Sequence, residues 1–165
     1  MIIGVIIIEI KCRQDNMEIK RIIENKESFM DLLLLGDEQE NMIEKYLYIG
    51  DLFALYDNDL KTVSVVTKED GETYEIKNLA TYEKYHGKGY GTHMLKYIIE
   101  EYKNKCKKLL LGTGDDDKIL TYYKKFGFTY SHTIKNFFVD NYDHEMFSDG
   151  KQLVDMIYLK YEYQE

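Results

Sequence analysis

The sequence predicts a single domain of mixed α/β class. Its 165 residues suit one domain, since domains most often contain about 100–150 residues. Hydrophobic residues make up 44% of the chain and charged residues 32%, a composition that supports a packed core. Segments with the periodicity of strands alternate with segments with the periodicity of helices. We therefore expect residues 1–165 to form one α/β domain.

The first half of the chain combines one early strand, two helices and three hairpin strands. β-branched residues mark the early strand, apolar side chains at helical spacing mark the helices, and short turns separate the hairpin strands. Gly36 ends the first helix, and Asp37 has the place of an N-cap for the second. The expected strands are 2–11, 52–56, 60–67 and Thr73–Thr81, and the expected helices are 16–35 and 37–50.

The second half contains two more helices and three more strands. One helix follows a cluster of glycines and carries an apolar stripe that includes Met94 and Tyr102. The other ends at Gly127, a residue that suits the position after a helix. The expected strands are 108–111, 128–138 and 152–161, and the second helix is 118–126.

The charge balance and the cysteines argue against several classes of protein. The chain has 22 Lys and Arg residues and 30 Asp and Glu residues, so its formal net charge is −8. Because nucleic-acid binding depends on neutralising phosphates, we expect no nucleic-acid partner. The apolar start, 1–8, is too short for a signal peptide or a membrane span, so we expect no membrane partner. Two cysteines, Cys12 and Cys106, make no disulfide framework, which indicates a reduced, cytoplasmic protein.

The stretch 78–92, NLATYEKYHGKGYGT, carries the clearest functional signal. An expected strand runs into a loop, and Gly87, Gly89 and Gly91 then open a helix. Glycine lets a ligand approach the backbone closely, and the first N–H groups of a helix bind anions, so a phosphate or pyrophosphate is the expected ligand. The dinucleotide fingerprint would need glycine in place of Thr92, and no P-loop is present. Taken alone, the glycines suit a flexible turn equally well.

Together with 121–128, TYYKKFGF, this stretch resembles the GNAT superfamily of acetyl-CoA-dependent N-acetyltransferases. The cofactor motif of that family, Q/R-x-x-G-x-G/A, corresponds to HGKGYG, with His86 in place of Gln or Arg. The late helix of the family, F-Y-x-x-x-G-F, corresponds to YYKKFGF, and NLAT is similar to its fourth strand. The tail from 137 to 157 is similar to a bacterial branch of the superfamily.

The resemblance implies both a fold and a reaction. The fold is a mixed, mostly antiparallel central sheet of about seven strands, splayed between strands 4 and 5 and flanked by about four helices. The reaction is transfer of an acetyl group from acetyl-CoA, as a co-substrate, to a primary amine by direct attack in a ternary complex. No metal is needed, and the spacing of the histidines, cysteines and carboxylates indicates no metal site. Homodimers through the last strands are ordinary in this family.

The resemblance also assigns residues to the cofactor. The backbone of the fourth strand would hold the pantetheine arm and the acetyl carbonyl, and the N–H groups from Gly87 to Thr92 would hold the pyrophosphate. The side chain of the first motif residue can still donate to a phosphate. The implied cofactor-binding residues are Leu79, Ala80, Thr81, His86, Gly87, Lys88, Gly89, Tyr90, Gly91 and Thr92.

Two side chains are candidates for proton transfer. Tyr123 would be the general acid that protonates the leaving thiolate, since a phenol titrates near ~10 and a thiol near ~8.5. Its ring could instead only pack against the core face of its helix. Glu75 would be the general base, acting directly or through water. The alternatives are a solvated carboxylate paired with Lys77 or Lys88, or an amine that arrives neutral and needs no base.

The acceptor cannot be identified from the sequence. Acidic stretches at 115–117 and 140–149 would attract a cationic amine, or would be solvated loops, and the first also suits a helix N-terminus. An aminoglycoside, a polyamine, an amino acid, and a protein N-terminus or lysine are all open. Two other functions compete with catalysis: a regulatory module of this fold that binds acyl-CoA without turnover, and nucleotide binding at the glycine loop.

Overall fold

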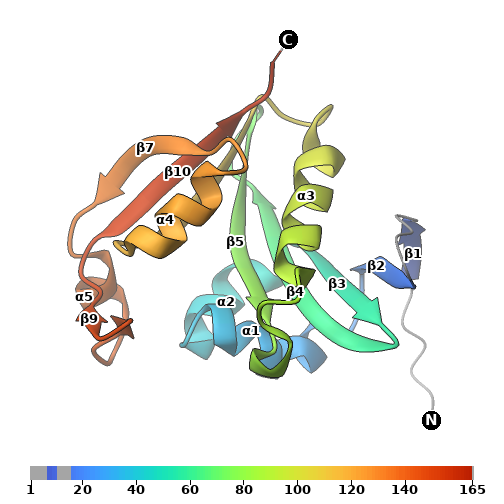
Figure 1. The fold of residues 1–165 in the computed structure, drawn as a ribbon, viewed down its shortest axis with the longest axis horizontal. Helices are drawn as coiled ribbons and strands as arrows, with labels where there is room; N and C mark the ends of the chain where they lie inside the picture. The colour runs from blue at the N-terminus through green and yellow to red at the C-terminus, as the bar shows by residue number, and fades with distance from the viewer. Residues whose placement is uncertain (1–6, 11–15, 165) are drawn as a thin grey trace. The chain divides into compact units, whose positions relative to one another are not determined.

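The computed structural model describes residues 7–10 and 16–164. Contacts divide the chain into two compact units. The first comprises the chain up to Lys68 together with Ile76–Asn104, and the second comprises Glu69–Glu75 together with the chain from Lys105 onward. The strand β5 (Thr73–Thr81) contributes residues to both units, and Figure 1 shows the elements.

The first unit is a sheet with helices. Its strands follow the order β1-β2-β3-β4-β5, and β1–β2, β2–β3 and β3–β4 pair antiparallel. Its strands besides β5 are β1 (Ile7–Ile10), β2 (Met17–Ile22), β3 (Asp51–Asp57) and β4 (Asp59–Lys68). Its helices are η1 (Lys26–Phe29), α1 (Met30–Gly36), α2 (Glu40–Leu47), η2 (Glu83–Tyr85) and α3 (Tyr90–Tyr102).

The prediction of one helix over 16–35 is wrong. The segment forms strand β2, which pairs with β3, and then the short helices η1 and α1. Ile19 and Ile22 are both buried, and their spacing of three imitates a helix, whereas Ile23 is exposed. Asn25 adopts a left-handed conformation that separates the strand from the helices. Of the expected strand 2–11, residues Ile7–Ile10 form β1 and the rest lie outside the described residues.

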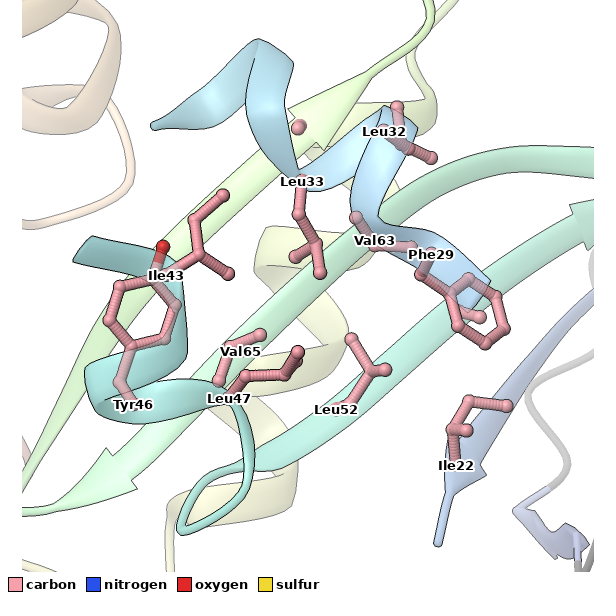
Figure 2. Close-up of a cluster of buried hydrophobic side chains, with 12 residues drawn as sticks. Ile22, Phe29, Leu32, Leu33, Ile43, Tyr46, Leu47, Leu52, Val63 and Val65 are labelled. Atoms are coloured by element: carbon pink, nitrogen blue, oxygen red, sulfur yellow. The ribbon is translucent and has the colours of Figure 1, made fainter. Parts of the chain in front are cut away.

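The central parts of β3 and β4 are buried on both faces. Leu52 and Val65 pack with α1 and α2 in the cluster of Figure 2. The ring of Phe53, on the opposite face of β3, lies edge-on to Tyr97 and Tyr102 of α3, with centroid distances of 5.5 and 6.4 Å. The centre of β4 is therefore buried, including both the apolar side chains Val63 and Val65 and the polar side chain of Ser64.

The second unit also contains strands and helices. The strand order is β5-β6-β10-β7, and β10 pairs antiparallel with both of its neighbours. A small β8–β9 hairpin is separate from this sheet. The elements besides β5 are β6 (Lys108–Gly114), α4 (Asp117–Lys124), β7 (Thr129–Ile134), α5 (Phe137–Asn141), β8 (Phe147–Ser148), β9 (Lys151–Gln152) and β10 (Met156–Glu162).

The predicted fold class is confirmed. The described chain is mixed α/β, and its strand pairs are mostly antiparallel with helices beside them. β5 and β6 are joined by helix α3, the kind of connection that parallel neighbours require. The expected strand 128–138 ends earlier, at Ile134, because Asn136 turns into α5 with a left-handed backbone. The expected splay of two strands stays a prediction.

Candidate active site

The glycine loop lies between β5 and α3 of the first unit. Gly87 and Gly89 have φ angles of +73° and +87°, and a Cβ at either position would meet nothing within 4 Å. Glycine is therefore required there by the left-handed backbone and not by packing. Gly89 is the N-cap of α3 and provides no side-chain acceptor for the first N–H groups of this 13-residue helix. A helix start of this kind is suited to an anion.

The last glycine of the motif is less constrained. A Cβ at Gly91 would lie 3.5 Å from the Thr81 hydroxyl oxygen, which is an ordinary contact. Alanine fits there, in agreement with the G/A position of the family motif. A Cβ would thus meet no atom within 4 Å at Gly87 and Gly89, and only an ordinary contact at Gly91.

His86 ties the glycine loop to the end of β5. Its Nε2 lies 2.8 Å from the carbonyl oxygen of Thr81, and because a carbonyl only accepts, the imidazole donates. His86 is otherwise exposed. His86, which occupies the Gln or Arg position of the family motif, therefore holds the loop through the backbone of Thr81. Thr81 is itself one of the residues assigned to the cofactor.

Side chains at the β3–β4 turn contact two tyrosines that flank the glycine loop, Tyr85 at the end of η2 and Tyr90 at the start of α3. We call this group the loop clamp: Asp57, Asp59, Lys61, Tyr85 and Tyr90. The Tyr85 hydroxyl donates to Asp59 at 2.5 Å, and the Tyr90 hydroxyl donates to Asp57 at 2.7 Å. The Lys61 ammonium pairs with Asp59 and lies 3.6 Å from the centroid of the Tyr85 ring. The hydrogen bonds from Lys61 and then from Tyr85 lower the pKa of Asp59 to about 2.

Sequence reasoning missed the loop clamp. It identified residues 57–59 only as a turn, since nothing in the local pattern links them to residues about 30 positions later. The sequence signal that could have revealed it is the pair Tyr85 and Tyr90, which flank the glycines, together with Asp57 and Asp59 on one short turn. The contacts of the loop clamp connect the glycine loop to strands β3 and β4 of the first unit.

A buried polar network holds the end of β5 against α1 and α2. The Asn78 amide donates to the Leu33 carbonyl at 2.9 Å and to the Tyr46 hydroxyl at 3.1 Å. The Tyr46 hydroxyl in turn donates to the Asp37 carboxylate at 3.1 Å. Burial, followed by the nearby Asp37, raises the pKa of Tyr46 far above its usual value. Asp37 is thus not the N-cap of α2 as predicted: Gln39 has that place, and Asp37 follows α1 as its C-cap.

The backbone of β5 is also held from β4. The Ser64 hydroxyl donates to the Asn78 carbonyl at 2.7 Å, and the hydroxyls of Thr62 and Thr81 lie 2.8 Å apart. Ala80 is buried, while Leu79 and Thr81 are partly exposed. The segment assigned to the pantetheine arm is therefore fixed by side-chain contacts on each side of Leu79.

Tyr123 lies on α4 of the second unit. Its ring is in edge contact with Tyr122 and Phe128, at centroid distances of 5.2 and 5.9 Å. Burial, followed by the charge of Tyr122, raises the pKa of Tyr123, so the phenol stays protonated at neutral pH. The ring contacts agree with the packing interpretation, and the protonated hydroxyl agrees with a proton donor.

Glu75 lies on the part of β5 that belongs to the second unit. Its side chain is 6% exposed, so it is buried and not a solvated carboxylate. The hydroxyl of Tyr158 donates to Glu75 Oε1 at 3.1 Å. The ten residues assigned to the cofactor thus lie in one unit, and the two candidate proton-transfer residues lie in the other.

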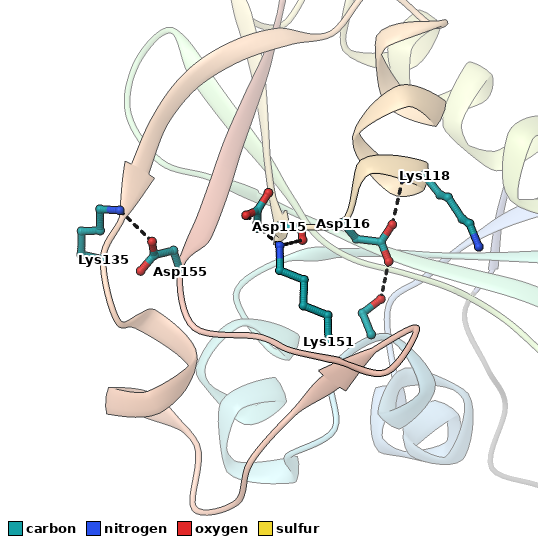
Figure 3. Close-up of polar contacts among 7 residues, drawn as sticks. Asp115, Asp116, Lys118, Lys135, Lys151 and Asp155 are labelled. Atoms are coloured by element: carbon teal, nitrogen blue, oxygen red, sulfur yellow. Dashed lines mark hydrogen bonds and ion pairs between the residues drawn. The ribbon is translucent and has the colours of Figure 1, made fainter.

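Several carboxylates of the acidic stretches are already engaged, as Figure 3 shows. Asp116 is the N-cap of α4, and its side chain accepts from the N–H groups of Lys118 and Ile119 and from the Ser148 hydroxyl. Lys118 pairs with Asp149 at 2.7 Å. The predicted role of the first stretch at a helix N-terminus is confirmed. These contacts also fasten the β8–β9 hairpin to the start of α4.

Metal and membrane features can be stated for the described residues. No group of three or more His, Cys, Asp or Glu side chains that could hold a metal ion is found among residues 7–10 and 16–164. In the same part of the chain, no helix is both long enough and apolar enough to cross a membrane.

Comparison with known proteins decides the family. A family model described as the acetyltransferase (GNAT) family matches residues 21–128. The chain belongs to the GNAT acetyltransferase family. A curated relative, the uncharacterized N-acetyltransferase YvbK of Bacillus subtilis, is 32% identical over 139 residues, which cover 82% of this chain and 90% of the relative.

Solved structures of GNAT proteins share the fold. An acetyltransferase from Elizabethkingia anophelis, solved with acetyl-CoA bound, has a TM-score of 0.84 and 39% identity, with 90% of this chain and 99% of that chain covered. An acetyltransferase from Bacillus subtilis in complex with CoA has a TM-score of 0.83 and 30% identity over the same shares. An IAA acetyltransferase from Bacillus cereus has a TM-score of 0.83 and 32% identity, covering 88% of this chain and 99% of that one.

Proposed function

We propose that this GNAT protein transfers the acetyl group of acetyl-CoA to a primary amine, by direct attack of the amine in a ternary complex. The observation that carries the proposal is the glycine loop, whose left-handed glycines open into free space at the start of α3. The relative solved with acetyl-CoA is 39% identical, which supports the same cofactor here. The N-acetyltransferase name of YvbK supports an amine acceptor.

The residues present fit the cofactor. N–H groups from Gly87 to Thr92 would bind the diphosphate, and the backbone of Leu79 to Thr81 would hold the pantetheine arm and the acetyl carbonyl. The loop clamp and the His86 contact keep this backbone in one arrangement. Preorganisation of this kind removes ordering costs from cofactor binding.

The chemistry assigned to the chain is proton transfer and positioning. Acetyl-CoA supplies the thioester, and a bond forms between the amine nitrogen and the acetyl carbon while the carbon–sulfur bond breaks. Glu75 would take the proton released by the amine, directly or through water. Tyr123 would donate its proton to the leaving sulfur. Because Glu75 is shielded from water, its interactions with developing charge are stronger than in solvent.

The proposal also covers the domain organisation, the cellular location and the class of acceptor. The two units together would make one acetyltransferase domain, because β5 contributes residues to both. A cytoplasmic location is supported by the small number of cysteines. The acceptor is a small-molecule or peptidyl amine, and homodimer formation is a further expectation of the family.

The test is release of CoA thiol with a panel of primary amines, with tertiary amines as the matched control. Thiol release that depends on the primary amine, together with acetylated product by mass spectrometry, is the expected result. Binding of acetyl-CoA without release on any amine would contradict the proposal and favour a regulatory module. Competition by ATP or NAD for the same site would favour a nucleotide-binding protein instead.

The role of Tyr123 is tested by Tyr123→Phe, with Tyr122→Phe on the same helix as control. We expect turnover to fall by roughly ten-fold or more in Tyr123→Phe while the KM for acetyl-CoA changes less than about two-fold, because only the proton donor is lost. Equal turnover in the two variants would remove Tyr123 from this role.

A further inference from the structure

Tyr158 reaches Glu75 from two strands away. In the second-unit sheet β6 lies between β5, which carries Glu75, and β10, which carries Tyr158. Neighbouring strands are about 4.8 Å apart, so roughly 10 Å separates the two backbones. The phenol must therefore pass over β6 to donate its 3.1 Å hydrogen bond.

Gly112 opens the passage over β6. It is the direct partner of Tyr158 in the β6–β10 pairing. A Cβ at this position would lie 3.1 Å from Cζ of the Tyr158 ring and 2.5 Å from the Met156 sulfur. The absence of a side chain at Gly112 is thus what lets the ring lie across the strand.

His132 fixes the ring from the other side. It is the partner of Tyr158 in the β7–β10 pairing, and its imidazole stacks on the phenol with a centroid distance of 4.6 Å and an angle of 6°. The Ser131 hydroxyl lies 3.0 Å from Nδ1 of His132. With Gly112 on one side and His132 on the other, the Tyr158 hydroxyl has one direction, toward Glu75.

The contact is buried at both ends, since Glu75 is 6% exposed and Tyr158 is 8% exposed. Burial and the Glu75 carboxylate raise the pKa of Tyr158, so its hydroxyl remains a donor throughout the neutral range. The other titratable groups facing the phenol are Glu69, in the turn before β5, and the stacked His132. This donor engages one oxygen of the Glu75 carboxylate and thereby orients it.

We propose that Tyr158 is a positioning residue that holds the Glu75 carboxylate in one orientation for proton transfer, through the passage that Gly112 opens over β6. The inference rests on the proposed function for the role of Glu75 as base. The contact itself does not depend on that role, so the two can be tested separately.

The experiment compares the wild type with Tyr158→Phe by two readouts. The first is the pH–rate profile of acetyl transfer: kcat falls by roughly ten-fold, the KM for acetyl-CoA changes little, and the acid limb moves to higher pH because the carboxylate has lost a donor. The second is the titration of the Glu75 carboxyl carbon by NMR in protein labelled at glutamate, whose midpoint moves to higher pH.

Two pairs of variants separate positioning from general damage. Gly112→Ala displaces the Tyr158 ring and shifts the Glu75 titration in the same direction, whereas Gly114→Ala, which crowds Leu153 on the same strand, leaves it unchanged. Tyr161→Phe on β10 is the control for loss of a phenol. If the wild type releases no thiol with any amine, the proposed function fails and the NMR titration alone decides the inference. An identical midpoint of the Glu75 titration in Tyr158→Phe and wild type would overturn the inference that Tyr158 positions Glu75.

Discussion

The first unit presents its expected cofactor site through backbone atoms, whereas the second unit presents its candidate reacting groups through side chains. The glycine loop depends on φ angles at Gly87 and Gly89 and on the start of α3. Tyr123 depends on aromatic neighbours, and Glu75 on a hydrogen bond from a residue 83 positions away. In the proposed function, binding of the long anionic cofactor would thus rely on local backbone geometry, and proton transfer would rely on tertiary contacts.

The two units also differ in what stabilises them. In the first unit, the centres of β3 and β4 are buried on both faces, and residues of α1, α2 and α3 pack against them. In the second unit, ion pairs and caps such as Asp116–Ser148 and Lys118–Asp149 fasten the β8–β9 hairpin at the surface. Exposed ion pairs contribute little to stability, whereas buried side chains contribute much. Substitutions in the first core should therefore have the larger effects.

The largest effect is expected for Leu33→Ala in the first-unit core. Leu33 is fully buried among residues of α2, β3 and β4. Its truncation removes apolar contacts and leaves a cavity, so the free energy of unfolding should fall by about 2–5 kcal/mol. Urea denaturation followed by circular dichroism measures the change. Leu35→Ala on the same helix is the control, because Leu35 is 49% exposed. Equal losses of unfolding free energy in Leu33→Ala and Leu35→Ala would contradict the assignment of Leu33 to the core.

A smaller loss is expected for Tyr46→Phe. The hydroxyl donates to Asp37 and accepts from Asn78 inside the protein. Without it both groups lose a buried partner, so unfolding should become easier by about 1–3 kcal/mol. Tyr48→Phe is the matched control, since Tyr48 is largely exposed on the same helix end. Equal stability of Tyr46→Phe and wild type in the same denaturation experiment would exclude a stabilising role for the network.

The smallest effect is expected for Ser148→Ala in the second unit, and it depends on pH. The Ser148 hydrogen bond, followed by the Ile119 N–H, lowers the pKa of Asp116 from 3.8. The stabilisation from this carboxylate is therefore present above the ordinary value and is lost as pH falls through the lowered one. The variant should melt slightly below the wild type at neutral pH, and the gap should close in acid.

Differential scanning calorimetry at pH 7 and at about pH 2 checks this prediction. A gap in melting temperature that stays constant between the two conditions would mean that Ser148 acts independently of the Asp116 charge. Ser28→Ala, which removes a hydroxyl bonded to the Asn25 carbonyl and no carboxylate, provides the control with no expected pH dependence.

Local features of the fold and site were predictable from the sequence. The glycine loop, the Asp116 cap and the Gly127 helix end all depend on residues within a few positions of each other. The strand β2 was missed because Ile19 and Ile22 are spaced as in a helix, and only pairing with β3 settles the strand. The loop clamp and the Tyr158–Glu75 contact join residues about 30 and 83 positions apart, which no local periodicity specifies.

The most direct test of the proposed cofactor site is the affinity for CoA of Gly89→Ala and Tyr123→Phe, measured by calorimetric titration. Alanine at position 89 meets no neighbour but strains the left-handed backbone of the loop, by about 1–2 kcal/mol, and we expect CoA to bind roughly ten-fold more weakly. Tyr123→Phe should bind CoA with an affinity within about two-fold of wild type. Gly71→Ala, in open space without a left-handed φ, is the control. Unchanged affinity in Gly89→Ala, or a loss confined to Tyr123→Phe, would contradict the account.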